Sequence, residues 1–313
     1  MAMQEFSHYS VLLSESIEGL NIKADGIYVD GTAGGGGHSF EIAKRLTSGR
    51  LIAIDQDEDA IAAVTKRLSE FADRVTVVRD NFSNLADVCK RLGIERIDGF
   101  LIDAGVSSFQ LDCAERGFAY SADAPLDMRM DTRNSLTARD VVNEYSEAQL
   151  KKILFEYGEE KFSPAIASAI VKARAVSPIE TTSQLSDIIK GAIPAYAREG
   201  GHHPAKRSFQ AIRIEVNREL DVLEPAIRAA EGLMREGGRI AVITFHSLED
   251  RIVKQTFASL AEGCKCPKSF PICVCGNTPK VRLVNKKPIL PSKDELDENP
   301  RSRSAKLRVA EKI

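Results

Sequence analysis

Apolar and polar residues alternate in blocks along residues 27–103, in a pattern typical of a parallel β-sheet. Four short apolar runs each meet an acidic residue: Ile27–Val29 and Asp30, Leu51–Ile54 and Asp55, Val75–Val78 and Asp80, Gly99–Ile102 and Asp103. Segments with helical periodicity separate the runs, near residues 38–47, 58–71 and 83–92. Apolar strands alternating with helices indicate a sheet covered on both faces. The acidic strand ends are then expected to share one edge of the sheet.

The strand–helix rhythm stops after residue 104 and resumes with the strand candidate Arg239–Phe245. A long helical stretch near 206–236 precedes that strand and closes with Gly237-Gly238, which would suit a helix C-cap. Later elements are a helix near 248–261 and strands at Val281–Lys286 and Lys306–Ala310.

The intervening region is mostly helical by pattern, for example at 146–157 and 163–175. We therefore expect an α/β fold in which a Rossmann-like sheet carries an inserted, mostly helical second domain. The sheet domain would comprise residues 1–104 and 206–313, and the insertion residues 105–205.

Charge is distributed unevenly along the 313 residues, although the net charge is only −2. Residues 1–104 carry 11 basic and 17 acidic side chains, whereas residues 216–313 carry 18 and 13. An anionic polymer would therefore be attracted to the C-terminal third and to local clusters. Because no stretch approaches the ~20 apolar residues of a membrane span, we expect a cytoplasmic protein without membrane contact.

The segment Asp30–His38 joins the first strand to the first helix and contains four consecutive glycines, Gly34 to Gly37. Glycines let the backbone turn sharply and approach a ligand closely. The spacing matches neither G-x-G-x-x-G nor a P-loop. An acid before the glycines would repel a pyrophosphate but would suit the ammonium and sulfonium of S-adenosylmethionine. Asp55 is placed to accept the ribose hydroxyls, and Phe82 to stack on adenine.

An alternative explanation is that Asp30 and Asp55 only cap helices and that Phe82 is a core residue. This explains each residue singly, whereas a cofactor explains why the set falls at successive strand ends. The sequence therefore predicts an S-adenosylmethionine site.

Asp103 ends the fourth strand, which in this class of fold faces the transferable methyl group. An exocyclic amine of a base is a poor nucleophile, so a methyltransferase needs an acceptor for its N–H. Asp103 can supply one, although the Asn/Asp-Pro-Pro-aromatic motif of many amino-methyltransferases is missing here. The alternative roles are a helix cap or a ribose ligand. His246 and Ser247 follow the fifth strand and complete the predicted catalytic set, unless His246 is only structural.

Basic residues gather in segment 198–218, where an aromatic residue, Phe209, is interleaved with them. Together with the polar loop Pro125–Asp131, this segment predicts a phosphate-contacting face formed by Arg129, Lys206, Arg207 and Arg213. The alternative is an amphipathic helix with a solvated basic face. The basic segment Asn299–Arg308 adds to the pattern. A base in folded RNA must be splayed out while its flanking phosphates are held, and such surfaces suit that task.

Four cysteines fall within a twelve-residue segment, as the pairs Cys264-x-Cys266 and Cys273-x-Cys275. Four thiolates could bind zinc tetrahedrally, although the spacing within each pair is tighter than usual. Free or redox-labile thiols and a disulfide are the alternatives.

The chain resembles the RsmH/MraW family, the 16S ribosomal RNA cytosine-N4 methyltransferases, along nearly its whole length. The resemblance rests on eight motifs: His8–Leu13, Asp30–His38, Asp103–Asp112, Arg116–Phe118, Pro125–Asp131, Lys206–Asn217, Phe245–Arg251 and Asn299–Ala310. It implies a class I methyltransferase fold with a helical substrate domain. It also implies cofactor contacts at Gly36, Gly37, His38, Asp55, Phe82, Asp103 and Gln110.

By the same resemblance, the substrate would be a cytidine in the decoding region of 16S rRNA in the 30S subunit. The chain departs from the family at Ser10, Ala104 and Phe109, and Phe109 adjoins Gln110. The cysteine pairs occur in only part of the family, which suggests that the chemistry does not need them.

Two other functions fit the residues less well. The first is a non-catalytic S-adenosylmethionine-binding factor for RNA or ribosome assembly. The second is a methyltransferase for DNA or a small molecule. The sequence does not decide the oligomeric state, and a homodimer is one option.

Overall fold

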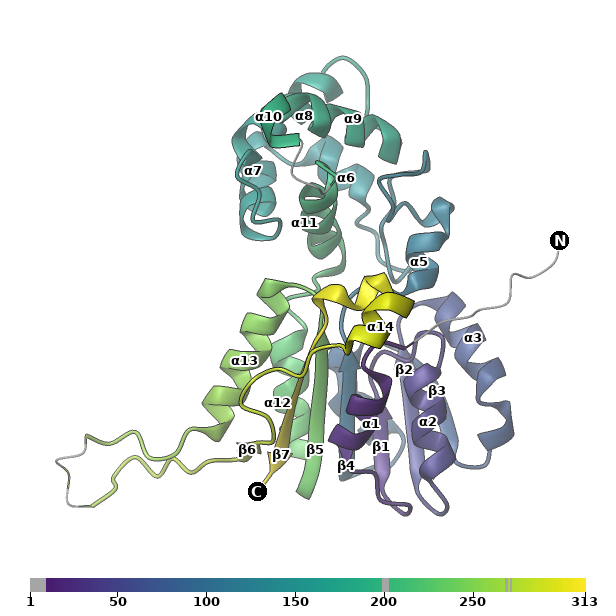
Figure 1. The fold of residues 1–313 in the computed structure, drawn as a ribbon, viewed down its shortest axis with the longest axis vertical. Coiled ribbons are helices and arrows are strands. Elements are labelled where there is room, and N and C mark those ends of the chain that lie inside the picture. Colours follow the sequence, from purple (N-terminus) through teal and green to yellow (C-terminus); the bar gives the residue numbers. More distant parts are fainter. Residues whose placement is uncertain (1–9, 199–202, 268–269, 271) are drawn as a thin grey trace. The chain divides into compact units, whose positions relative to one another are not determined.

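The structure is a computed structural model that describes residues 10–198, 203–267, 270 and 272–313 (Figure 1). Residues 8–9 and 199–202, which belong to two of the sequence motifs, lie outside the described residues. The chain divides into two compact units. The first comprises Met1–Gly105 and Leu220–Ile313, and the second comprises Val106–Glu219.

The first unit contains a seven-stranded sheet in the order β3-β2-β1-β4-β5-β7-β6. The strands are β1 (Ile27–Asp30), β2 (Arg50–Asp55), β3 (Val75–Arg79), β4 (Ile97–Asp103), β5 (Met234–Thr244), β6 (Val281–Leu283) and β7 (Lys306–Lys312). Strands β1 to β5 are parallel, and β7 runs antiparallel between β5 and β6. The chain order reverses between β1 and β4, which is where open α/β sheets bind ligands.

Helices cover both faces of this sheet, as the apolar strands predicted. They are α1 (Leu13–Leu20), α2 (Gly37–Arg45), α3 (Glu58–Arg67), α4 (Leu85–Arg91), α12 (Leu223–Leu233) and α13 (Ser247–Ala261), and the unit also contains the short helix α14 (Lys293–Glu298). Alternate strand residues enter two apolar clusters, Ile52 and Phe100 in one and Leu51 and Leu101 in the other. The first cluster includes residues of α4, α12 and α13, and the second includes residues of α1, α2 and α3.

The second unit is helical and has its own apolar core. Its helices are α5 (Ser108–Asp112), α6 (Ala138–Glu144), α7 (Glu147–Glu156), α8 (Ser163–Arg174), α9 (Thr182–Ala192), α10 (Ala195–Arg198) and α11 (Lys206–Asn217). Several begin at a capping box, in which a Ser or Thr hydroxyl accepts the N–H of the third helical residue. Thr137, Ser146 and Thr181 start α6, α7 and α9 in this way. These residues satisfy N–H groups that the helix itself leaves open.

Two expectations about the region before β5 are corrected. The helical stretch expected near 206–236 is two helices, because α11 ends at Arg218 in a left-handed conformation with φ of 52°. Gly237 and Gly238 do not cap a helix but lie inside β5, where the pairing with β4 shifts register. A glycine at φ of 76° permits that irregularity.

Helix α11 also falls in the second unit, whereas we expected the sheet domain to resume at residue 206. The reason is packing, since Phe209, Ile212 and Val216 belong to the apolar core of the helical unit. With this change of boundary, the expected Rossmann-like α/β sheet with a mostly helical insertion is confirmed. Within the described ranges, no helix combines the length and apolar character that crossing a bilayer requires.

Candidate functional site

The carboxyl ends of β1, β2 and β4 form a notch at one edge of the sheet. Asp30, the last residue of β1, is paired with Ala53 of β2 and Leu101 of β4. Both neighbouring strands run two residues further, to Asp55 and Asp103. Strand β1 therefore ends short, and the loop that follows it begins between two longer strands.

Asp30 is only 1% exposed and stabilises the start of this loop. Its carboxylate accepts hydrogen bonds from the Ser39 hydroxyl at 2.7 Å and from the Thr32 N–H at 3.1 Å. Burial raises the pKa of Asp30 to about 6, against the lowering effect of these bonds. Both of its oxygens thus serve the loop, so its immediate role is to fix the polypeptide that leads into α2.

Asp55 holds the glycine turn in the same manner. One oxygen accepts the Gly34 N–H at 2.8 Å and the other accepts the Asp57 N–H at 2.9 Å. Burial raises the pKa of Asp55 to about 6, and the nearby Asp57 and Asp30 carboxylates add to the shift. The side chain remains partly exposed, so its oxygens can still accept hydroxyl groups.

Glycine is required at Gly36 and at Gly37 for two different structural reasons. Gly36 precedes α2 with φ of 79°, a conformation that side chains disfavour. A Cβ at Gly36 would also lie 3.1 Å from carbons of Val64 and Arg67. At Gly37 a Cβ would lie 1.8 Å from the hydroxyl oxygen of Ser10. Gly37 therefore admits the N-terminal segment, and Ser10 is one of the positions where this chain departs from the family.

Asp103 ends β4 with one carboxyl oxygen, Oδ1, that is buried and has no hydrogen-bond partner among the described residues. About a fifth of the side chain is exposed. Burial raises the pKa of Asp103 well above its usual value, and the carboxylates of Asp30, Glu249 and Glu295 raise it further. Its backbone N–H donates to the Thr32 hydroxyl at 2.6 Å, which fixes the strand end. An unsatisfied buried acceptor is costly, so Asp103 is a candidate functional residue.

His38 lies beside Asp103 at the start of α2 and is 5% exposed. Its Nε2 is 3.1 Å from the Val11 carbonyl oxygen, and its Nδ1 is 3.9 Å from an Asp103 oxygen. A carbonyl only accepts, so Nε2 carries the proton. The imidazole consequently presents Nδ1 toward Asp103 at a distance too long for a direct hydrogen bond.

His246 and Ser247 follow β5 at the same edge as Asp103. Glu249, which is 1% exposed, accepts the backbone N–H groups of Phe245 at 2.8 Å and His246 at 3.2 Å. Its other oxygen lies 3.1 Å from Nε2 of His246. This carboxylate holds the histidine in place at the start of α13, while Ser247 is exposed in the first turn.

Glu249 and Glu295 lie close enough to Asp103 to raise its pKa, although no role was expected for either from the sequence. Glu249 is recognisable as the third residue of a capping box. Glu295 lies on α14 and accepts the Leu12 N–H at 2.8 Å. No local pattern identifies it, because only the fold brings the C-terminal helix to this edge.

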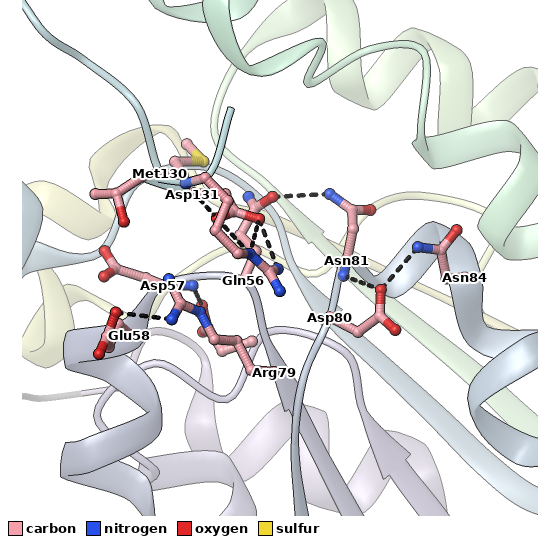
Figure 2. Close-up of polar contacts among 12 residues, drawn as sticks. Gln56, Asp57, Glu58, Arg79, Asp80, Asn81, Asn84, Met130 and Asp131 are labelled. Atoms are coloured by element: carbon pink, nitrogen blue, oxygen red, sulfur yellow. Dashed lines mark hydrogen bonds and ion pairs between the residues drawn. The ribbon is translucent and has the colours of Figure 1, made fainter. Parts of the chain in front are cut away.

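Polar side chains connect the loops after β2 and β3 (Figure 2). The Asn81 amide donates to the Gln56 oxygen at 2.9 Å, and Arg79 pairs with Glu58 at 2.7 Å. Asp80 accepts hydrogen bonds from the side chains of Asn84, at 2.7 Å, and Arg91, at 2.6 Å. Burial tends to raise the pKa of Asp80, but these hydrogen bonds lower it overall. Asp80 is therefore structural.

Phe82 begins the turn after β3 and is only partly buried. It packs against the apolar cluster beneath the sheet, and its Cβ would lie 2.9 Å from a Cβ placed on Gly31. The ring thus has a packing role at the notch, and stacking on adenine stays a prediction.

These residues fit S-adenosylmethionine in three respects. The glycine turn leaves room beside the backbone at Gly34, where a Cβ would meet only the Thr32 carbonyl oxygen, at 3.8 Å. Asp103 provides an acceptor without a partner. The acids Asp30, Asp55 and Asp103 have raised pKa values, so a cation placed among them would be stabilised.

Comparison with known proteins agrees with this geometry. The model of the MraW methylase family matches residues 5–313. The chain belongs to the MraW methylase family. Members of this family are methylases, so the chain is a methyltransferase, as the sequence analysis expected.

Curated relatives of this methylase resemble it over their full length. "Ribosomal RNA small subunit methyltransferase H 2" of Agathobacter rectalis is 61% identical over 98% of this chain and 99% of the relative. "Ribosomal RNA small subunit methyltransferase H" of Lachnospira eligens is 58% identical over 99% of both chains. Among solved structures, an rRNA methylase from Streptococcus thermophilus has a TM-score of 0.44 at 12% identity, covering 98% of this chain and 99% of that one. That likeness is too weak to bear on function.

The second unit of the methylase uses most of its charged motif residues internally. Arg129 forms a two-point ion pair with Asp127, at 2.9 and 2.6 Å, which raises the pKa of the Arg129 guanidinium. Arg213 does the same with the buried Glu219, at 2.8 and 2.9 Å. Neither guanidinium presents the open fork that a phosphate requires. Both guanidinium groups are therefore engaged within the unit, and contact with RNA stays a prediction for Arg129 and Arg213.

Asn217 joins two of the sequence motifs of this unit, which the sequence did not reveal. Its side chain donates to the Met128 carbonyl at 2.8 Å and accepts the Met130 N–H at 2.7 Å. These bonds hold Met128 at φ of 60°. The end of α11 thus anchors the loop Pro125–Asp131. Polar groups of this loop are used to hold its own conformation.

Lys206 and Arg207 remain exposed at the start of α11, as a phosphate-contacting face requires. Gln110 has a different local role from the one expected. It is buried, and its side-chain oxygen accepts the Ser107 N–H at 3.0 Å in a capping box. Contact with the cofactor stays a prediction for Gln110.

The four cysteines Cys264, Cys266, Cys273 and Cys275 are brought together on the segment between α13 and β6. All four are unbridged, and their sulfur atoms lie within 4.8 Å of one another.

Proposed function

We propose that this methylase transfers a methyl group from S-adenosylmethionine to the amino nitrogen N4 of a cytidine in 16S ribosomal RNA. The target would be a nucleotide of the decoding region in the 30S subunit. Curated relatives at 58–61% identity bear small-subunit ribosomal RNA in their names, which supports the RNA class. The resemblance of the motifs to cytosine-N4 methyltransferases supports the choice of base.

The observation that carries this proposal is the unpartnered oxygen of Asp103 at the end of β4. The lone pair of cytosine's amino nitrogen is delocalised into the ring, which makes the nitrogen a poor nucleophile. An acceptor for its N–H makes that nitrogen more nucleophilic. Asp103 would accept that N–H. Positive charge that develops on the nitrogen would be stabilised by the surrounding carboxylates.

The cofactor, when bound, supplies a methyl group on a positively charged sulfur. Asp55 would accept the ribose hydroxyls, and the turn at Gly34–Gly37 would let the backbone approach the amino-acid part. Phe82 would flank the adenine. His38 and Glu249 keep the edge of the sheet ordered around Asp103.

The reaction forms a bond between N4 and the methyl carbon and breaks the carbon–sulfur bond. The nitrogen then loses a proton, which passes to water. His246 would contact the flipped nucleotide beside Asp103, and Ser247 is exposed next to it. Lys206 and Arg207 would hold the flanking phosphates.

The direct test is mass mapping of small-subunit RNA from cells that lack this protein. We expect one cytidine to lose one methyl group, and the wild-type gene, but not Asp103→Ala, to restore it. Loss of a methyl group from another base, or from DNA only, would contradict the proposal.

A second measurement separates catalysis from cofactor binding. Calorimetry on the purified chain should detect binding of S-adenosylmethionine and of its demethylated product. If the cofactor binds but the RNA of the deletion strain is unchanged, the alternative of a non-catalytic assembly factor would hold.

A further inference from the structure

The segment 262–280, between α13 and β6, forms a loop whose base is closed by hydrogen bonds. The Lys280 N–H donates to the Leu260 carbonyl at 2.8 Å. The Asn277 side chain donates to the carbonyls of Glu262 and Gly263, at 2.8 and 2.7 Å. Beyond this base, the described residues of the loop form neither helix nor strand. So long a connection without helix or strand among its described residues needs a specific cause.

Apolar burial does not provide that cause. Phe270, Ile272 and Val274 are large apolar residues of the loop, and they are 49%, 75% and 73% exposed. A short segment without a core of its own is usually held by disulfides or a metal. What the described part of the loop does bring together is its four cysteines.

Three of the four sulfur atoms, those of Cys264, Cys273 and Cys275, stand close to the separations of a tetrahedral metal site, and the Cys266 sulfur lies within 4.8 Å of each of them. Cys264 lies 3.3 Å from Cys273 and 3.8 Å from Cys275, and Cys273 lies 3.6 Å from Cys275, measured between Sγ atoms. Zinc–sulfur bonds of ~2.3 Å place tetrahedral sulfur ligands ~3.8 Å apart. A disulfide would require ~2 Å, and none of these cysteines is bridged.

The backbone around the sulfurs is arranged as a metal-binding knuckle. The residue inside each cysteine pair donates its N–H to a sulfur of the other pair: Lys265 to Cys275 and Val274 to Cys266, both at 3.3 Å. The Asn277 N–H also donates to the Cys275 sulfur, at 3.4 Å, so that this sulfur accepts two N–H groups. Such donors stabilise thiolates, the form that binds metal. The reciprocal bonds also explain why one intervening residue suffices in each pair.

From these contacts we propose that Cys264, Cys266, Cys273 and Cys275 bind one structural Zn²⁺ ion. Four thiolates leave no coordination position open, so the ion would have no part in catalysis. Tetrahedral sulfur ligands suit zinc, whereas octahedral oxygen-preferring ions would find no suitable ligand. The ion would replace the missing apolar core and order the loop.

Strand register places this site at the edge of the sheet opposite Asp103. Asp103 pairs with Ile243 near the carboxyl end of β5. Arg239, toward the other end of β5, pairs with Glu311 of β7. The next residue of β7, Lys312, pairs with Val281 at the start of β6. The loop joins β6 there, and α13 spans ~22 Å from Ser247 to Ala261. Loss of zinc should therefore leave cofactor binding unchanged.

The test uses the full-length chain, purified without added metal, and measures bound metals by plasma mass spectrometry. We expect about one zinc per chain, as a single four-thiolate site requires. The double variant Cys273→Ser/Cys275→Ser should lose it. Cys113→Ser, a cysteine outside the cluster, is the matched control and should keep it. Limited proteolysis should cut the loop of the double variant faster than that of the control.

Cobalt substitution tests the ligand set independently of yield. Wild-type protein refilled with Co²⁺ should show the thiolate-to-metal charge-transfer bands and intense visible bands of a tetrahedral sulfur site. The double variant should not. Wild-type protein without metal, or with disulfides in the loop by mass spectrometry, would overturn the proposal. Iron in place of zinc would overturn the choice of ion.

Calorimetry with S-adenosylmethionine on the same samples keeps this proposal separate from the catalytic one. Unchanged cofactor affinity in the zinc-free variant is the expected result. If zinc loss abolished cofactor binding, the ion could not be a remote structural element.

Discussion

In the sheet unit Asp103 keeps a buried carboxyl oxygen without a partner among the described residues, whereas in the helical unit Arg129 and Arg213 have their guanidinium groups bound by carboxylates. Both units are rich in charged sequence motifs, and the sequence treated them as equal candidates for function. These charged residues differ in whether their polar atoms already have partners within the protein. Charged groups that pair with each other can stabilise a fold, while a buried group without a partner costs stability, and for Asp103 the proposed compensation is a hydrogen bond to the substrate.

The comparison is tested most strongly at Asp103. Asp103→Ala should lower the rate of methyl transfer ~100- to 10,000-fold, because it removes the acceptor for the substrate N–H. The dissociation constant for S-adenosylmethionine, measured by calorimetry, should change much less. Equal losses in rate and affinity would make Asp103 a cofactor ligand instead.

Asp103→Asn is the matched variant, because it keeps the shape and removes the charge. It should be inactive yet at least as stable as the wild type in urea, since the buried carboxylate has acidic neighbours. A clear loss of stability would show that the carboxylate is structural.

The opposite behaviour is expected for the buried pair of the helical unit. Arg213→Ala leaves Glu219, only 5% exposed, without its cation. We expect the free energy of unfolding to fall by ~3–5 kcal/mol, measured by urea denaturation. Arg139→Ala removes an exposed ion pair with Glu180 and should cause no measurable loss. Similar results for the two variants would show that Arg213 does not stabilise this unit.

The pH dependence of cofactor binding sharpens the comparison further. Asp30 and Asp55 have pKa values of about 6 in the folded protein, above their usual value near 4. The folded chain therefore binds more protons than the unfolded chain between about pH 4 and 6. The contribution of these two acids to the stability of the folded protein consequently falls as pH rises through that window. A bound cation offsets the loss once both acids are ionised.

Thermal shift measurements can detect this linkage. Stabilisation by S-adenosylmethionine should be greater at about pH 7.5 than at about pH 5. The demethylated product has a neutral sulfur and should show a weaker dependence. Asp55→Asn should reduce the dependence for both. Equal, pH-independent shifts for cofactor and product would contradict the proposed role of the acids.

Two glycines separate backbone strain from site geometry. Gly36 and Gly93 have φ of 79° and 67°, so alanine at either should cost ~1 kcal/mol of stability. Only Gly36 has close neighbours at the start of α2, whereas a Cβ on Gly93 would meet nothing within 4 Å. Gly36→Ala should therefore weaken cofactor binding in calorimetry, and Gly93→Ala should not.

The smallest effect is expected at the exposed start of α11. Lys206→Glu/Arg207→Glu should weaken binding of 16S RNA and reduce the slope of log affinity against log salt by ~1–2, because two phosphate contacts are lost. Lys151→Glu/Lys152→Glu, an exposed pair on α7, is the control of equal charge change. Equal effects from both pairs would indicate non-specific attraction.

The sequence by itself determined the strands β1 to β4 of this protein and the acids at their carboxyl ends. Apolar runs ending in acids locate β1 to β4 to within two residues, because the burial and the ends of these strands depend on the local order of apolar and polar residues. The same patterns failed at Gly237-Gly238, where a glycine pair suits a helix cap and a strand irregularity equally well.

Only the tertiary structure decided which polar residues are already occupied. Arg213 and Glu219 are six residues apart, yet their pairing depends on how α11 ends, and Glu295 approaches Asp103 from the far end of the chain. The cysteine spacing left zinc, thiols and a disulfide open, and only the fold shows how close the four sulfur atoms lie, which is the basis of the zinc proposal. Hydrogen bonds and interactions between charges depend on the separation of atoms in space. The separation of two residues along the sequence does not determine it.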